Sequence, residues 1–316
     1  MQISEYSIPF IGEESQAPYE QAKVVLLPVP YELTTTYRKG CETGPAAILE
    51  ATDQLEFYDV ELGKEVVFET GVFVHDAIAD TQQPNHQLTP ELMVEQVKAK
   101  ISHLFADGKF VITLGGEHGI TAGVVAGYQQ VLSEPFTVVQ IDAHGDMRDS
   151  YHGSIYNHAC VMRRVLEMGL PTLPVAIRSI CREEADLIAE KEIPVIWAHE
   201  IVQSPGDWIE KAIAQIKTPR VFITIDLDGM DPAFMPGVGT PQPGGLDWYQ
   251  LTAFLRQVFL THEVIGCDVM ELAPLTESVV SEFTAAKLVH KLIGYYSHSS
   301  YSCPCNSNNW GTVTNS

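Results

Sequence analysis

The chain has 316 residues, of which 45% are hydrophobic and 19% are charged, and its formal net charge is −22. This composition is too apolar for a disordered protein, and the apolar runs are far shorter than the roughly 20 residues that a membrane span requires. The acidic balance argues against a nucleic-acid partner, because phosphate binding needs clustered Lys and Arg. It suits a small cationic ligand, or it serves solubility alone.

The N-terminal residues and the cysteines indicate the compartment. Residues 1–13 contain no basic start followed by an apolar run, so no signal peptide is predicted. The cysteines are scattered over the chain, which favours reduced thiols in the cytoplasm over a disulfide framework. The six are Cys41, Cys160, Cys181, Cys267, Cys303 and Cys305.

Short runs rich in Val, Ile and Phe recur along the chain and predict strands that are buried on both faces. Segments with helical spacing lie between them, and Pro45 is placed for the first turn of a helix. Strands that alternate with helices predict a parallel sheet covered on both sides. The predicted strands are Val24–Val29 and residues 110–114, 136–141, 173–177, 221–225 and 264–267, and the predicted helices include residues 91–105, 183–190, 208–216 and 248–259.

No glycine-serine linker and no internal repeat divides the chain, so a single domain is predicted over residues 1–295. Residues 296–316 are rich in Ser, Asn and Cys, and we expect them to form a loosely ordered tail. Cys303 and Cys305 lie in this tail, but two thiols do not complete a zinc site.

Four of the predicted strands run directly into a group of polar residues. The carboxyl ends of parallel strands meet at one edge of a sheet, and α/β proteins bind ligands there. Carboxylates crowded at that edge would repel one another unless a cation lay among them. The four groups are Gly115-Gly116-Glu117-His118, Asp142-Ala143-His144-Gly145-Asp146, Asp226-Leu227-Asp228 and Asp268-Val269-Met270-Glu271.

Within these groups we predict that two imidazoles and four carboxylates are metal ligands. In an extended segment, residues two apart point to the same side, so the aspartates and histidines of each group would converge. Six donors exceed the need of one ion and match two divalent ions that share bridging carboxylates. The set is rich in oxygen and lacks cysteine, which favours Mn²⁺, while Ni²⁺ or Co²⁺ would also fit. The predicted ligands are His118, Asp142, His144, Asp146, Asp226 and Asp228.

Counting formal charges points to a cationic substrate. Two divalent ions and one hydroxide among four carboxylates leave the centre at about −1. A planar guanidinium suits such a site if a further carboxylate holds it at two points, and Glu271 follows a neighbouring strand. His158 lies in a predicted loop before a helix, where it would be either a proton shuttle or an ordinary surface histidine.

Taken together, these motifs closely resemble those of the ureohydrolases, the family of arginase, agmatinase, guanidinobutyrase and formiminoglutamase. The resemblance covers residues 24–296, and its third motif is Thr224-Ile225-Asp226-Leu227-Asp228-Gly229-Met230-Asp231-Pro232. It implies a three-layer αβα fold around a mainly parallel sheet, and assembly into homotrimers or homohexamers.

The resemblance also implies a cofactor and residue roles. Two Mn²⁺ ions per subunit would be bridged by Asp142 and Asp226. Asp231 would lie just outside the ligands, Glu271 would hold the guanidinium, and His158 would shuttle protons. The remaining ligands would be His118 and Asp146 for one ion, and His144 and Asp228 for the other.

Within the family, residues 31–40, 146–151, 158–164 and 282–289 are most similar to agmatinases. The implied reaction is cleavage of a guanidino compound to urea and an amine, with agmatine and putrescine as the first choice and polyamine biosynthesis as the role. Gly119 and Ala273 depart from residues common in the family, Ser and Asn. Both bear on the pocket, so 4-guanidinobutyrate, guanidine and arginine stay open as substrates.

Two other classes of protein remain as alternatives. A catalytically silent relative could bind metal or polyamine and regulate a partner, but such a protein should have lost ligands, and all six are present. A zinc amidohydrolase or deacetylase could share the layered architecture, and the number of metal ions per chain distinguishes it.

Overall fold

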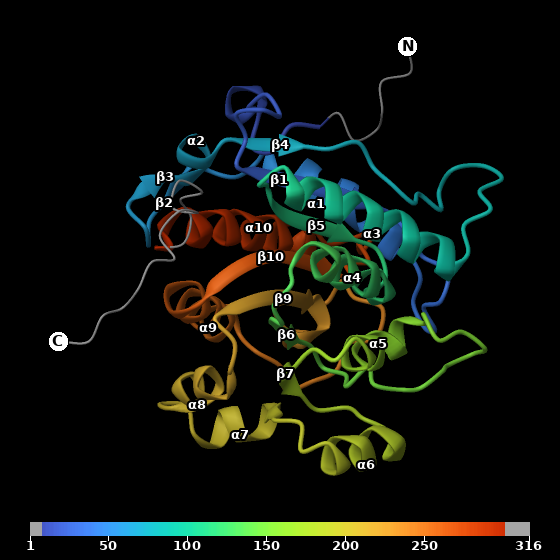
Figure 1. Cartoon of the computed structure of the whole chain (residues 1–316). Helices are drawn as coiled ribbons and strands as arrows, with labels where there is room; N and C mark the ends of the chain where they lie inside the picture. The colour runs from blue at the N-terminus through green and yellow to red at the C-terminus, as the bar shows by residue number, and fades with distance from the viewer. Residues whose placement is uncertain (1–7, 301–316) are drawn as a thin grey trace.

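A parallel sheet of eight strands lies at the centre of residues 8–300, the part of the chain that this computed structural model describes (Figure 1). The strand order is β4-β1-β5-β10-β9-β6-β7-β8, and every neighbouring pair is parallel. The predicted parallel sheet is therefore confirmed. The strands are β1 (Val24–Val29), β4 (Val72–Val74), β5 (Phe110–Gly115), β6 (Thr137–Ile141), β7 (Thr172–Ile177), β8 (Ile196–Trp197), β9 (Arg220–Asp226) and β10 (Glu263–Met270).

Helices cover both faces of the sheet and complete three layers, as the resemblance implied (Figure 1). One face packs against α1 (Gly44–Thr52), α2 (Val66–Thr70), α7 (Ala198–Gln203), α8 (Trp208–Gln215), α9 (Trp248–Thr261) and α10 (Val280–His298). The other packs against α3 (Pro90–Ala106), α4 (Thr121–Val131), α5 (Val161–Glu167) and α6 (Arg182–Glu190). A small antiparallel pair, β2 (Tyr58–Asp59) and β3 (Lys64–Glu65), lies apart from the main sheet.

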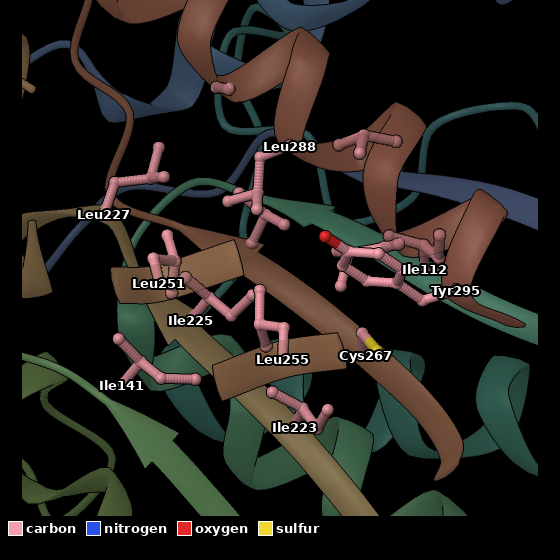
Figure 2. Packing of buried hydrophobic residues seen from close by; sticks show 14 of the residues in the cluster. Ile112, Ile141, Ile223, Ile225, Leu227, Leu251, Leu255, Cys267, Leu288 and Tyr295 are labelled. Carbon is pink, nitrogen blue, oxygen red and sulfur yellow. The ribbon is translucent and has the colours of Figure 1, made fainter. Parts of the chain in front are cut away.

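The strands are buried on both faces because apolar side chains point into both helical layers. Figure 2 shows part of one layer, where Leu251 and Leu255 of α9 and Leu288 of α10 belong to the same cluster as Ile223 and Ile225 of β9. Full burial of each such side chain contributes roughly 1.5–3 kcal/mol to stability. This core holds the strand ends, and so the polar residues that follow them, in fixed positions.

The chain order of the strands differs from their order in the sheet. β10 comes last along the described chain but lies between β5 and β9. Its residue Asp268 is in register with Thr113 of β5 and with Thr224 of β9. As a result, the carboxyl ends of β5, β10, β9 and β6 are consecutive along one edge of the sheet.

Among the helices that the sequence pattern did not predict, α4 has a clear physical explanation. The sequence analysis did not predict α4, which contains Gly123 and Gly127, and glycine lowers helix propensity. A Cβ at Gly123 would come within 2.8 Å of the Val94 carbonyl oxygen, and one at Gly127 within 2.7 Å of Ile101 Cβ. The glycines therefore let α4 approach α3 closely.

The end of α10 bears on the predicted tail. This helix continues to His298, so residues 296–298 are helical, although the tail was expected to start at residue 296. Cys303 and Cys305 lie outside the described residues, and the remaining tail prediction stays a prediction. None of the helices in the described part of the chain combines the length and the apolar character that a bilayer crossing demands.

Candidate metal centre and active site

The six predicted ligands come together at the carboxyl ends of β5, β6 and β9 and form two groups that share Asp142. Within each group the donor atoms all lie within 4.8 Å of one another. The first group is His118, Asp142, Asp146 and Asp226, and the second is Asp142, His144 and Asp228.

In the first group, three carboxylates surround one ring nitrogen of His118. Nδ1 of His118 lies 3.2 Å from Asp142 Oδ2, 3.1 Å from Asp146 Oδ2 and 3.3 Å from Asp226 Oδ2. His118 begins the short 3-10 helix η3 (His118–Ile120), which follows β5 after two residues. All four side chains are buried.

In the second group, Nδ1 of His144 lies 3.0 Å from Asp228 Oδ2 and 3.6 Å from Asp142 Oδ1. Asp142 thus turns one carboxylate oxygen to each group, the arrangement expected of a bridging ligand. Asp226 belongs to the first group alone. Its bridging role stays a prediction.

The backbone brings these residues together by turning, where the sequence analysis assumed an extended chain. β6 ends at Ile141, and Asp146 adopts a φ of 51°. Asp142 Oδ1 accepts a 2.6 Å hydrogen bond from the backbone N–H of His144. Asp228 lies in the 3-10 helix η5 (Leu227–Gly229), and its N–H donates to Asp226 Oδ1 at 2.9 Å. These side chain–backbone bonds are typical of aspartate in turns.

Burial and mutual repulsion perturb the acidity of the cluster. Burial raises the pKa of Asp226 well above its ordinary value, and the charges of Asp228 and Asp142 add to the effect. Burial and the charge of Asp142 raise the pKa of Asp146 to about 7. Burial would lower the pKa of His118, but the surrounding carboxylates raise it well above its ordinary value. So much buried negative charge requires cations, and divalent ions would supply them more effectively than protons.

The donor set fits divalent metal ions. Two imidazole nitrogens and four carboxylates are concentrated in a buried space, and no cysteine belongs to either group. Oxygen-rich sets with imidazole suit Mn²⁺ and related first-row ions. Gly229 makes the packing of the cluster feasible, because a Cβ at this position would lie 2.8 Å from the backbone nitrogen of Asp142.

A cavity of about 200 Å³ opens onto the cluster and is lined by His144, Asp146 and Asp226, together with His158 and Glu271. A wider cavity of about 1010 Å³ lies between α8, α9 and α10, and none of the predicted ligands lines it. The smaller cavity is therefore the candidate active site, because it combines a concave space with perturbed titratable groups.

Glu271 follows β10 and lies beside the first group. Its side chain is buried, and Oε1 accepts the backbone N–H of His118 at 2.7 Å. Its backbone has a φ of 67°, a strained value for a residue other than glycine, and its N–H donates to Gly116 O at 2.8 Å. Burial raises its pKa well above the ordinary value. The structure thus places this carboxylate in the cavity, as expected for a group that holds a guanidinium.

His158 lies opposite Glu271, with Nδ1 at 3.7 Å from Glu271 Oε1. It starts the 3-10 helix η4 (His158–Cys160), whose N-terminus is capped by the side chain of Asn157. Nε2 lies 3.5 Å from Thr36 Oγ1. Burial and the charges of His144 and His118 lower its pKa to about 4. A histidine in this position is a candidate proton shuttle, and the surface-histidine alternative does not match its burial.

Asp231 lies farther from the two groups. Its carboxylate accepts backbone N–H groups from Ala233 at 2.9 Å, Gly244 at 2.7 Å and Gly245 at 3.3 Å. These contacts fix the turn that follows Asp228. They place Asp231 outside the ligands, where it supports the loop and not a ligand side chain.

Several residues around the cluster were not assigned roles from the sequence. Gln140 donates to Asp142 Oδ2 at 2.7 Å, and Thr240 donates to Asp228 Oδ2 at 3.3 Å. Thr224 lies 2.8 Å from His118 Nε2. Gln140 and Thr224 each precede a ligand by two residues on a strand, so the period of two could have identified them. Thr240 lies in a loop, and no comparable signal marks it.

Comparisons with known proteins extend these observations. A family model described as "Arginase family" matches residues 22–294. The N(1)-aminopropylagmatine ureohydrolase of Synechocystis sp. is 59% identical over 290 residues, which are 92% of this chain and 94% of that protein. The protein of the same name from Thermus thermophilus is 37% identical over 286 residues, 89% of this chain and 92% of the relative. The solved agmatine ureohydrolase of Thermoplasma volcanium is 31% identical with a TM-score of 0.80, and the match covers 93% of this chain and 95% of that one.

Proposed function

Because the chain belongs to the arginase family and is a ureohydrolase, we propose that its substrate is N1-aminopropylagmatine. Addition of one water to the guanidino carbon and cleavage of the bond to the alkyl nitrogen give urea and a triamine, spermidine. The observation that carries the proposal is the 59% identity, over 92% of the chain, to a relative with that name. This replaces agmatine, the first choice of the sequence analysis, with an aminopropyl derivative of it.

Two Mn²⁺ ions per subunit are part of the proposal. One would be held by the first group of ligands and the other by the second, with Asp142 common to both. When bound, such ions would lower the pKa of a water molecule so that it can attack the guanidino carbon. Ni²⁺ and Co²⁺ suit the same donors and are included in the metal test below.

The chain's own residues would position the guanidinium and move protons. Glu271 lies in the cavity with a carboxylate that can accept two N–H groups of a planar guanidinium. His158, 3.7 Å from Glu271 Oε1, would deliver a proton to the alkyl nitrogen as it leaves. Amine departure needs this proton, because an amide anion is a poor leaving group.

Agmatine is the second candidate, supported by the likeness to the agmatine ureohydrolase of Thermoplasma volcanium. The two substrates share the guanidinobutyl portion and differ at the far end, where one has a primary amine and the other an aminopropyl extension. The metal ligands, Glu271 and His158 would act on the shared portion, so they do not discriminate between the two.

The test is urea release by the Mn²⁺-loaded protein from N1-aminopropylagmatine, agmatine, 4-guanidinobutyrate, guanidine and arginine. We expect kcat/KM to be at least about tenfold higher for N1-aminopropylagmatine than for agmatine, a difference of ~1.4 kcal/mol in transition-state stabilisation. Controls are the chelator-treated protein and loading with Ni²⁺ or Co²⁺. A preference for agmatine would establish the second candidate, and absence of urea from every compound would refute both and favour a non-catalytic regulator.

We also expect a cytoplasmic location and assembly into a homotrimer or homohexamer. Cell fractionation tests the first expectation, and light scattering of the purified protein tests the second. A monomer in solution would contradict the expected assembly and leave the substrate proposal unaffected.

A further inference from the structure

Asp268 is a fully buried carboxylate in the middle of the sheet that none of the roles above uses. It lies on β10 and has no exposed surface. Among the ion pairs of residues 8–300, Asp268 has no lysine or arginine partner. Burying an acidic group without a cation is unfavourable unless hydrogen bonds stabilise it, so the contacts of this carboxylate matter for the fold around it.

Two threonine hydroxyls connect this carboxylate to the predicted metal centre. Thr121 Oγ1 donates to Asp268 Oδ2 at 2.8 Å. Thr224 is in register with Asp268 on the neighbouring strand, and its hydroxyl oxygen lies 3.3 Å from that of Thr121. A hydroxyl has a single hydrogen, and that of Thr121 is directed at Asp268, so Thr224 is the donor in the contact with Thr121.

The donor role of Thr224 toward Thr121 determines how Thr224 contacts His118. Thr224 Oγ1 lies 2.8 Å from His118 Nε2. The single hydrogen of the Thr224 hydroxyl is directed at Thr121. The Thr224 oxygen must therefore accept, which requires a hydrogen on Nε2 of His118.

The other ring nitrogen of His118 is the one that faces the ligand carboxylates. Nδ1 lies 3.1 to 3.3 Å from oxygens of Asp142, Asp146 and Asp226. A neutral imidazole with its hydrogen on Nε2 presents a lone pair at Nδ1, the form that binds a metal ion.

We propose, resting on the metal site of the proposed function, that Asp268 is a positioning residue that acts through Thr121 and Thr224 to hold His118 in its metal-binding tautomer. The chain of contacts runs from the carboxylate through two hydroxyls to the imidazole, across β10, the start of α4, β9 and the start of η3. Hydrogen bonds of this kind behind a metal ligand typically contribute 10–100-fold to metal affinity.

The roles of Thr224 and Asp268 are tested with variants that remove a hydrogen bond with little change in packing. Thr224→Val removes the hydroxyl at nearly constant volume, and Thr224→Ser keeps it. Asp268→Leu removes the acceptor with a side chain of similar shape. Thr113→Val is the matched control, because Thr113 flanks Asp268 on the opposite neighbouring strand, is fully buried, and its hydroxyl has no hydrogen-bond partner.

The measurements are Mn²⁺ stoichiometry and dissociation constants by competition with a chelator, together with the thermal stability of the metal-free proteins. We expect Thr224→Val and Asp268→Leu to weaken one of the two ions at least about tenfold, while Thr224→Ser and Thr113→Val bind like the wild type. The double variant Thr224→Val/Asp268→Leu should bind Mn²⁺ no more weakly than the single variant that has the lower affinity. Both substitutions interrupt the same chain of contacts, so their effects should not add.

Wild-type affinity for both ions in Thr224→Val would overturn the inference, as would an equal loss in Thr113→Val. Additive losses in the double variant would also overturn it, since they indicate independent structural effects. If Asp268→Leu does not fold, the comparison of Thr224→Val with Thr224→Ser decides the matter. A wild-type protein that binds no pair of ions would refute the metal site of the proposed function, whereas a wild type with two ions and unaffected variants refutes this inference alone.

Discussion

Glu117 and His158 are connected through one hydroxyl group, that of Thr34. Thr34 Oγ1 donates to Glu117 Oε1 at 2.5 Å and accepts the backbone N–H of His158 at 2.9 Å. Glu117 Oε2 also accepts the N–H groups of Leu33 and Thr34, each at 2.6 Å. The residue that precedes His118 therefore fixes the loop that contains Thr34, and this loop fixes the position of His158.

Replacing Thr34 by Val should impair proton transfer more than metal binding. The variant removes the acceptor for the His158 N–H, so His158 loses its fixed position relative to Glu271. We expect kcat for the best substrate to fall about tenfold or more with little change in KM, the pattern of an interaction lost in the transition state. Thr34→Ser should restore kcat, and an equal fall in bound metal would contradict this account.

Removing Asp142 should affect both metal ions, whereas removing Asp146 should affect one. Asp142 faces both groups, and Asp146 belongs to the first group alone. Elemental analysis of the purified variants should give about zero ions per chain for Asp142→Ala and about one for Asp146→Ala, on the two-ion arrangement proposed. Two ions retained in Asp142→Ala would show that this carboxylate does not bridge.

Replacing Arg178 by Lys should loosen the loops behind the second group. The Arg178 guanidinium donates to carbonyl oxygens on both sides, at 2.7 Å to Asp228 and 2.7 Å to Gln242. A lysine cannot reproduce this planar set of donors, and a buried carbonyl such as that of Asp228, left unsatisfied, costs about 1–3 kcal/mol. Denaturant titration should show that loss, with a weaker second ion. Arg182→Lys is the control, because Arg182 pairs with Asp186 at the exposed surface and such pairs contribute little.

The stability contributed by Asp59 should depend on pH in a defined direction. Burial alone would raise the pKa of Asp59, but the hydrogen bond from Lys291 and backbone N–H groups lower it below the ordinary value. A lowered pKa in the folded state stabilises the protein above the unfolded-state pKa, and this stabilisation is lost as the pH falls through the folded-state pKa.

Unfolding of the wild type and Asp59→Asn should therefore differ most near neutral pH. The difference in unfolding free energy should shrink as the pH falls below ~4, the ordinary range for aspartate. Asp186→Asn serves as an exposed control with no expected difference. A gap that stays constant or widens in acid would contradict the role of the Asp59–Lys291 pair, whose Nζ–Oδ2 distance is 2.9 Å.

The convergence of the six predicted ligands could be inferred from the sequence because each lies at or shortly after the end of a strand of recognisable pattern. His118, Asp142 and Asp226 have side chains of the kind that bind metal ions, and they lie near the ends of strands. A parallel arrangement of these strands was therefore enough to predict that they meet. The turns were less accessible: the φ of 51° at Asp146 replaces the extended chain that was assumed. Residue type alone does not report such a conformation.

The supporting network could not be predicted, because it depends on strand order. Asp268 meets Thr224 only because β10 lies beside β9, and no local pattern indicates that neighbour. Glu117 stood within a recognised motif, yet its partners Leu33 and Thr34 are more than 80 residues away along the chain. Residues that touch ligands from distant segments thus need the three-dimensional structure to be found.

The central position of β10 has a consequence for how the protein is made. A nascent chain that has not yet extended past residue 262 lacks the strand between β5 and β9, so its strands cannot join into one sheet. His118 on one part and Asp226 on the other would then stay apart, and the first group of ligands would not exist. Metal uptake should accordingly follow the completion of synthesis, and ribosome-bound fragments ending before β10 should capture neither of the two ions proposed for the finished protein.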